Sequence, residues 1–321
     1  MSEIINDLKK KYKVHEETES YFKTRAENGN KPYHEMSLDE ARLQKEEIAK
    51  QFGGDVEFEG TVKDFTVPSP YAKDGVPITV YRSKNCAMVV APSVFVYFHG
   101  GGNVVGSRKT VDTVCRIFSR DAPCVVVNVD YRLGPEHRYP ANHEDAVCVV
   151  RWVKMNKGLI GAVNESTVGV GGDSAGGRLA ASVCHEELNI NYQVLVYPSL
   201  DYRRKFKSDK EFVKGPVLSE EILQWFNHHY IHEHDFEKPR ASPLLYKSFN
   251  KVPPALIIMA ELDMNRDHGY AYHEKLKEAG VKSQTFTVKG VTHGFFVMPG
   301  QFKECCQRAH EKVSKFIKAH S

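Results

Sequence analysis

Short apolar runs and helix-type patterns alternate through most of the chain. The runs are apolar at nearly every position, whereas a strand with one exposed face alternates apolar and polar residues. They therefore predict a parallel sheet covered on both faces, with right-handed helical crossovers, which is an α/β fold. The predicted strands are 93–99, 124–131, 167–172, 192–200, 254–260 and 283–288, and the predicted helices are 108–120, 140–156, 175–188, 266–279 and 302–319.

The pattern near the N-terminus is different. The first 50 or so residues have apolar positions at helical spacing, and Ser37 with Glu40 has the spacing of a capping box at a helix start. Two strand-like segments follow, 56–67 and 76–83, and a turn region with Pro, Asp and Gly separates them. These two segments predict an antiparallel pair.

Residues 202–250 interrupt the alternation further along the chain. This segment lies between two predicted strands and is far longer than the usual connection between such elements. It predicts a lid with its own helix, which starts near Ser219. The chain therefore divides into an N-terminal helical segment (1–54), a core in two parts (55–201 and 251–321) and an insertion (202–250).

Composition excludes several classes of partner. The chain has 321 residues, and its 44 basic and 41 acidic residues are mixed along its length, so neither nucleic acid nor an anionic membrane is a favoured partner. We find no signal-peptide pattern and no apolar stretch of the roughly 18 to 20 residues that a membrane span requires. The seven cysteines include no CxxC pair, and reduced thiols in the cytoplasm are the expectation.

A nucleophile candidate lies in the stretch "VGVGGDSAGG". Ser174 occupies a Gly-x-Ser-x-Gly sequence between a predicted strand and a predicted helix, which is the context this motif requires. A tight turn there holds the serine in a strained conformation with its hydroxyl above the sheet. Taken alone, a glycine-rich turn with a capping serine is also compatible with the motif.

A serine hydroxyl needs a base to remove its proton, and the base needs an acid to orient it. His293 follows the last predicted strand, and Asp263 follows the strand "PALIIMA". The order Ser174, Asp263, His293 is that of an α/β-hydrolase triad. Each residue alone could be an ordinary loop or capping residue, but their shared order at strand ends favours a catalytic triad.

Three consecutive glycines follow the first strand of the parallel series, in "FHGGGNVVGS". Glycine weakens a strand, but it can expose backbone N–H groups without a side chain in the way, as an oxyanion hole requires. The sequence His99-Gly100-Gly101-Gly102 is the HGGG-type loop of lipases and esterases. We expect the amides of Gly101, Gly102 and Ala175 to be the oxyanion donors.

These motifs resemble those of the hormone-sensitive-lipase-like α/β-hydrolase carboxylesterases, which include arylacetamide deacetylase-like esterases. The resemblance extends to "DYRLGPEHRYPA" (130–141), "SPLL" (242–245) and "HGF" (293–295). It implies an α/β-hydrolase fold with a mostly parallel sheet, and a helical cap made of segments 1–54 and 202–250. It also implies hydrolysis of short- to medium-chain esters through an acyl-enzyme without a metal or organic cofactor, and an orienting role for His99.

Some positions depart from the family pattern. Asn103 replaces the usual aromatic residue after HGGG, Gly134 replaces the alanine of YRLAPE, and Arg178 replaces the asparagine after GDSAGG. Asn103 is expected to make the pocket wall more polar. In the lid, Trp225 and Phe226 are candidates to line the substrate pocket, although packing within the lid explains them equally well.

Other activities stay open. His228 and His232 have i, i+4 spacing, but no third ligand is evident, so an exposed lid surface is expected and no metal site. The same fold could cleave amides, as in xenobiotic deacetylation, or act as a lyase, or serve as a non-catalytic small-molecule receptor. The expected partner is a small-molecule ester, and a homodimer is left open.

Overall fold

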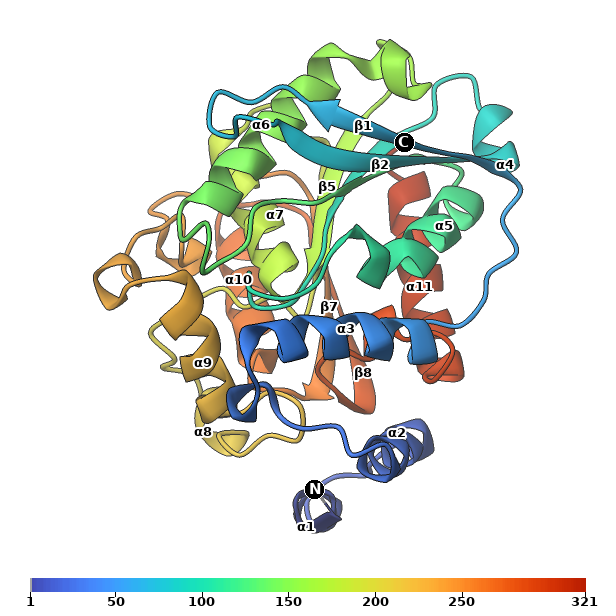
Figure 1. Cartoon of the computed structure of the whole chain (residues 1–321). Coiled ribbons are helices and arrows are strands. Elements are labelled where there is room, and N and C mark those ends of the chain that lie inside the picture. Colours follow the sequence, from blue (N-terminus) through green and yellow to red (C-terminus); the bar gives the residue numbers. More distant parts are fainter. Residues whose placement is uncertain (1) are drawn as a thin grey trace.

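The computed structural model describes residues 2–321 and centres on an eight-stranded sheet in the order β1-β2-β4-β3-β5-β6-β7-β8 (Figure 1). β1 pairs antiparallel with β2, and β2 pairs antiparallel with β4, while all other pairs are parallel. The predicted early antiparallel pair and parallel series are confirmed. The strands are β1 (Gly60–Val67), β2 (Val76–Ser83), β3 (Val94–Phe98), β4 (Val125–Val129), β5 (Val168–Asp173), β6 (Tyr192–Val196), β7 (Ala255–Leu262) and β8 (Ser283–Thr292).

The central strands are buried on both faces. Every residue of β3 is fully buried, and alternate side chains point to opposite sides of the sheet. Val96 belongs to one hydrophobic cluster, whereas Phe95 and Tyr97 belong to the cluster on the other face. This double burial explains why the strand sequences are uniformly apolar.

Two layers of helices cover the sheet (Figure 1). Helices α6, α7 and α10 lie on one side, and α5 and α11 lie on the other. Their bounds differ from the predicted ranges by only a few residues at each end. The layer helices are α5 (Asp112–Asp121), α6 (Ala141–Met155), α7 (Ala175–Glu186), α10 (Arg266–Glu278) and α11 (Lys303–Lys318), and the short α4 (Lys84–Ala87) follows β2.

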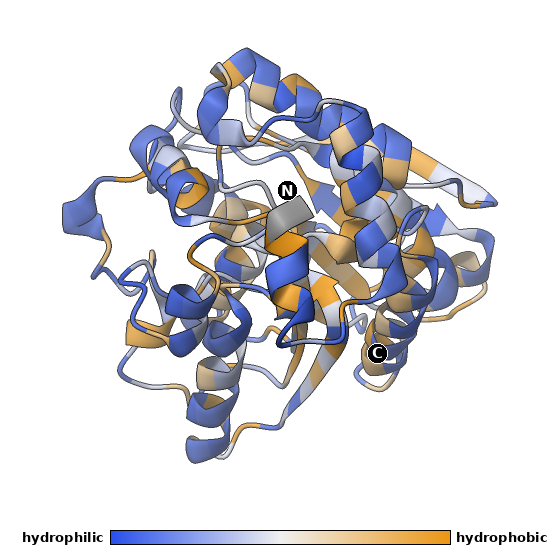
Figure 2. Ribbon diagram, turned by 90° about the horizontal axis from the view of Figure 1, so that it is seen from below, coloured by the Kyte–Doolittle hydropathy of each residue, from blue (hydrophilic) through white to orange (hydrophobic). Residues whose placement is uncertain are grey.

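The remaining helices lie at the carboxyl ends of the parallel strands, at the bottom of Figure 1 and facing the reader in Figure 2. They come from the two segments that the sequence sets apart from the core. The N-terminal segment contributes α1 (Ser2–Lys9), α2 (Glu16–Glu27) and α3 (Leu38–Phe52), and the insertion contributes α8 (Lys207–Glu211) and α9 (Glu220–Tyr230). The capping box of Ser37 and Glu40 starts α3, and Ser219 caps α9, as predicted.

The two segments contact one another. The Tyr33 ring packs on Trp225 and Phe226, at centroid distances of 6.1 and 5.6 Å, and their residues share one hydrophobic cluster. They therefore form a continuous roof over the strand ends. In the described part of the chain, no helix is both long and apolar enough to cross a membrane.

Candidate active site

Ser174 lies in the turn between β5 and α7. Its backbone has φ of +56°, a conformation that non-glycine residues adopt only when the surroundings enforce it. The flanking glycines allow the turn to lie against β3, because a Cβ on Gly172 or Gly176 would come within 2.2 or 1.9 Å of the Phe98 carbonyl oxygen. The Gly-x-Ser-x-Gly pattern is thus required by close packing at the end of the strand.

The structure brings Ser174, His293 and Asp263 together. Nε2 of His293 lies 2.9 Å from the Ser174 Oγ, and Nδ1 lies 2.7 Å from the Asp263 Oδ2. Because a carboxylate only accepts hydrogen bonds, Nδ1 carries the proton and Nε2 accepts from the serine hydroxyl. Asp263 is 2% exposed, and its Oδ1 accepts a hydrogen bond from the Asn265 backbone, so its orientation is set on both sides.

The glycine loop after β3 faces the Ser174 turn. Gly101 and Gly102 have φ of +122° and +61°, which favours glycine at both positions. Within residues 2–321, the amides of Gly101, Gly102 and Ala175 donate no hydrogen bond to the protein. These three N–H groups are therefore available to a bound oxyanion.

Asp173 anchors this loop, a role that the sequence analysis did not assign. Its carboxylate accepts hydrogen bonds from the Gly100 amide at 2.9 Å and from the Tyr97 hydroxyl at 3.1 Å. Its position in the sequence could have indicated this role, because Asp173 immediately precedes Ser174 in GDSAGG. The side chain ties the nucleophile turn to the glycine loop.

His99 also orients the glycine loop. Its Nδ1 donates to the Gly100 carbonyl at 2.8 Å, and its ring stacks on Tyr131 with a centroid distance of 4.4 Å. Burial lowers the pKa of His99, which favours the neutral imidazole with its proton on Nδ1. His99 is fully buried and does not contact the cavity beside Ser174.

A cavity of about 540 Å³ lies between Ser174 and the roof. Its wall is mostly apolar, as is usual for a small-molecule site. Phe226 from α9 contributes to this wall beside Gly102. Other apolar wall residues come from three parts of the chain, namely Tyr21 and Ile48, Leu218 and Ile222, and Val297 and Met298.

Two of the residues predicted to line the pocket lie elsewhere. Asn103 is fully buried, and its Oδ1 accepts a hydrogen bond from Asn142 at 2.8 Å, so the expectation of a more polar pocket wall at this position is corrected. Trp225 stacks on Tyr33 within the roof and is not part of the cavity wall. Helical geometry explains the difference from Phe226, since adjacent residues of a helix point in directions about 100° apart.

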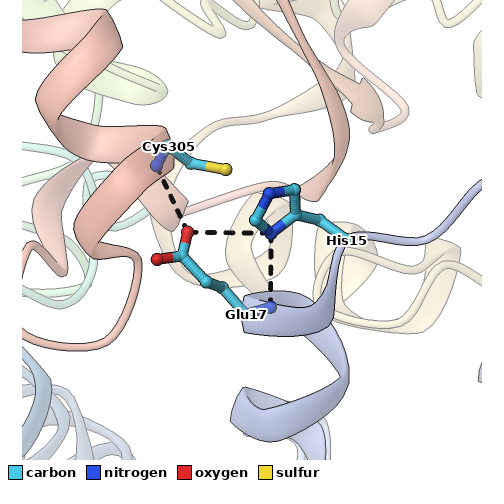
Figure 3. A group of neighbouring side chains, drawn as sticks. All are labelled: His15, Glu17 and Cys305. Atoms are coloured by element: carbon cyan, nitrogen blue, oxygen red, sulfur yellow. Dashed lines mark hydrogen bonds and ion pairs between the residues drawn. The ribbon is translucent and has the colours of Figure 1, made fainter.

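One group of described side chains has the proximity that a metal site requires: His15, Glu17 and Cys305 (Figure 3). The Glu17 carboxylate accepts from the backbone amides of Glu304 and Cys305, at 2.8 and 3.2 Å, at the start of α11. The group therefore fastens α2 to α11 through a helix cap. His228 and His232 are both exposed, and α9 ends before His232.

The family model and the related proteins agree with one another. Residues 95–297 match the family described as alpha/beta hydrolase fold. Ethyl acetate hydrolase from Pseudomonas putida is 34% identical over 85% of this chain and 87% of its own length. An arylesterase from Saccharolobus solfataricus is 34% identical over 70% of this chain and 74% of its own length.

Solved structures agree over almost the whole chain. An alpha/beta hydrolase from the metagenome of Lake Arreo superposes with a TM-score of 0.89, at 30% identity, over 96% of this chain and 98% of that one. An esterase from Pyrobaculum calidifontis superposes with a TM-score of 0.84, at 32% identity, over 96% of this chain and 99% of that one. The similarity therefore includes the roof segments as well as the sheet.

Proposed function

The chain belongs to the alpha/beta hydrolase fold family and is a carboxylic ester hydrolase, and we propose that it works through an acyl-enzyme formed on Ser174. In the first step His293 takes the hydroxyl proton of Ser174 while Oγ attacks the ester carbonyl carbon. The tetrahedral intermediate collapses, the C–O bond to the alcohol breaks, and His293 gives the proton to the leaving alcohol. Water then attacks the acyl-enzyme with His293 again as base, which releases the acid.

Asp263 holds the imidazole in the tautomer that accepts at Nε2, and it stabilises the imidazolium that forms during each step. The amides of Gly101, Gly102 and Ala175 stabilise the oxyanion of both intermediates. The observation that carries this proposal is the unbroken hydrogen-bond chain from Asp263 through His293 to Ser174, with the three unused amides beside it.

The proposed substrates are small esters with short- to medium-chain acyl groups. A cavity of about 540 Å³ with a mostly apolar wall supports this size class. We further propose a cytoplasmic location, supported by seven cysteines that are all free in the described chain.

A homodimer is also proposed, since β8 is an edge strand of the sheet and could pair with a second copy. Light scattering tests whether the mass in solution is twice 36.4 kDa.

The central test is Ser174→Ala. We expect the variant to fold and to lose at least about 1,000-fold in kcat on p-nitrophenyl butyrate, because no other group supplies the nucleophile. A fluorophosphonate probe should label the wild type at one site and leave Ser174→Ala unlabelled. Equal turnover by the two proteins, or labelling at another residue, would show that Ser174 is not the nucleophile.

A further inference from the structure

The cavity beside Ser174 contains basic side chains that ester hydrolysis itself does not need. Arg25 from α2, Lys45 from α3, Arg178 from α7 and Arg204 all contribute to its wall. Arg204 is neutralised, since it contacts Asp209 at 3.3 Å and also donates to Asn265 and Ser199. The other three form no ion pair with any described residue. Their charge therefore needs another explanation.

Arg25 is the clearest of these cases. The residue is only 8% exposed, and its buried Nε has no hydrogen-bond partner. The Tyr21 ring lies beside it, with its centroid 5.7 Å from the guanidinium carbon, and the Arg25 charge also acts on Tyr33. A buried guanidinium without a carboxylate is unfavourable, because desolvation costs free energy that no opposite charge returns.

Lys45 adds a second positive charge close to the first. Burial lowers the pKa of Lys45, the nearby Asp173 carboxylate opposes that shift, and the Arg25 charge adds to it. Lys45 nevertheless keeps part of its surface accessible, because it faces the cavity. Two like charges in one buried wall repel each other, and an anion between them would relieve this repulsion.

No acidic residue of the cavity wall is paired with Arg25 in the way that such an anion would be. Asp173 uses its carboxylate to hold Gly100 and Tyr97, as described above. Glu35 and Glu221 also reach the cavity, but both are exposed and lie at its rim. Asp173 keeps its negative charge and acts on Lys45, but in the described part of the chain no carboxylate of the wall forms an ion pair with Arg25.

Arg178 differs from this pair. Its guanidinium carbon lies 4.4 Å from the Tyr202 ring centroid and 5.8 Å from that of Tyr230. Two aromatic faces stabilise a guanidinium without any anion. Arg178 is as buried as Arg25, and its Nη2 also lacks a hydrogen-bond partner, but two aromatic rings pack on its guanidinium. Arg25 has one such ring, that of Tyr21, at the longer distance of 5.7 Å.

We propose that the ester hydrolysed by this protein carries a carboxylate, which Arg25 binds with the help of Lys45. The inference rests on the proposed function and names its substrate class. The planar guanidinium fork of Arg25 matches the two oxygens of a carboxylate, and the Lys45 ammonium adds a point charge. The carboxylate belongs either to the acyl group, as in a hemiester of a dicarboxylic acid, or to the alcohol.

The experiment compares matched pairs of esters in which a free carboxylate is replaced by its methyl ester. For the acyl side, the pair is the p-nitrophenyl hemiester of adipic acid and its methyl-capped diester. For the alcohol side, the pair is 4-acetoxybenzoate and its methyl ester. Each pair is assayed with the wild type, Arg25→Gln, Arg25→Lys and Lys45→Gln, and also with Lys214→Gln, which removes one positive charge from the exposed rim of the same cavity.

In one of the two pairs, we expect the wild type to prefer the charged ester by at least about tenfold in kcat/KM. Arg25→Gln should remove this preference by a rise of about 10- to 100-fold in KM for the charged ester, with kcat for the neutral ester nearly unchanged. Arg25→Lys should restore part of the preference, Lys45→Gln should reduce it less, and Lys214→Gln should leave it within about twofold.

Binding without turnover gives a second measurement. In a Ser174→Ala background, monomethyl adipate or 4-acetoxybenzoate should raise the melting temperature, and Arg25→Gln should abolish that rise. A wild type that prefers the neutral ester in both pairs overturns the inference. A preference for the charged ester that Arg25→Gln leaves intact overturns it as well. These outcomes are separable from failure of the proposed function, because fluorophosphonate labelling of Ser174 in the wild type and in Arg25→Gln reports the nucleophile alone.

Discussion

The two sides of the cavity are built differently. On the strand-end side, the polar groups have partners: His293 contacts both Ser174 and Asp263, and Asp173 holds the glycine loop. On the roof side, Arg25 and Lys45 have no ion-pair partner among the described residues. A group that is already paired is preorganised for a reaction, whereas an unpaired one is available to a ligand.

The difference separates chemistry from selection. Groups that act in the transition state must be in place before the substrate arrives, so the core holds them with buried hydrogen bonds. Groups that recognise a particular substrate gain their partner only when it binds. The roof comes from segments outside the sheet, and its residues can change without disturbing the strand ends.

The largest effect should come from breaking the strand-end side at Gly102. In Gly102→Ala the new Cβ would lie 2.3 Å from the Phe226 ring, at a backbone φ of +61°. The loop must move, which displaces an oxyanion donor and should lower kcat on p-nitrophenyl butyrate about 100- to 1,000-fold.

The matched control for this change is Gly280→Ala. Gly280 also has a positive φ, of +73°, but nothing lies within 4 Å of a Cβ there. Gly280→Ala should lose about 1 to 2 kcal/mol of stability from backbone strain, Gly102→Ala should lose at least as much, and only Gly102→Ala should lose turnover. Retained kcat in Gly102→Ala would remove this amide from the proposed oxyanion hole.

An intermediate effect is expected on the roof side at Phe226. Phe226→Ala enlarges the cavity, so kcat/KM for p-nitrophenyl acetate should fall about tenfold, while the octanoate ester should lose less. The ratio of octanoate to acetate rates measures this shift. Trp225→Ala is the control, since Trp225 is not part of the cavity wall and should leave the ratio unchanged. A shift of equal size in both variants would contradict the assigned wall.

The smallest effect on turnover is expected in the core, where His310 on α11 changes only the dependence of stability on pH. Burial lowers the pKa of His310 from 6.5 to about 4, so the folded state excludes a proton that the unfolded chain binds. The free energy of unfolding is therefore highest above pH 6.5 and falls as the pH decreases toward 4. Between pH 6.5 and 5 this single group should cost about 2 kcal/mol.

Urea unfolding of His310→Gln tests this contribution. The glutamine amide can still donate to the Phe296 carbonyl, as Nε2 of His310 does at 2.9 Å, but it does not titrate. Its stability should therefore depend less on pH than that of the wild type, by the amount given above. His234→Gln at an exposed position should keep the wild-type dependence, and identical slopes in all three proteins would contradict the assignment.

Much of the fold could be predicted because its signals are local. Uniformly apolar runs indicated buried strands, and Ser219 indicated the start of α9. α2 was harder to define, since its buried residues include Thr18 and Arg25 beside Tyr21 and Phe22, and this mixture weakens the apolar periodicity. Because the periodicity is weak, the sequence does not show that Arg25 lies on the buried face of this helix and contributes to a cavity wall.

By itself, the sequence determined the order of the elements and the three residues that meet at the strand ends, because Ser174, Asp263 and His293 each follow a strand of one parallel sheet. Only the tertiary structure decided which roof side chains face the cavity. Asn103 points into the protein, Phe226 points toward Gly102, and Arg25 reaches the cavity from a helix about 150 residues before the serine. The reason is that parallel strands align their carboxyl ends at one edge, whereas the orientation of the roof depends on packing between distant segments.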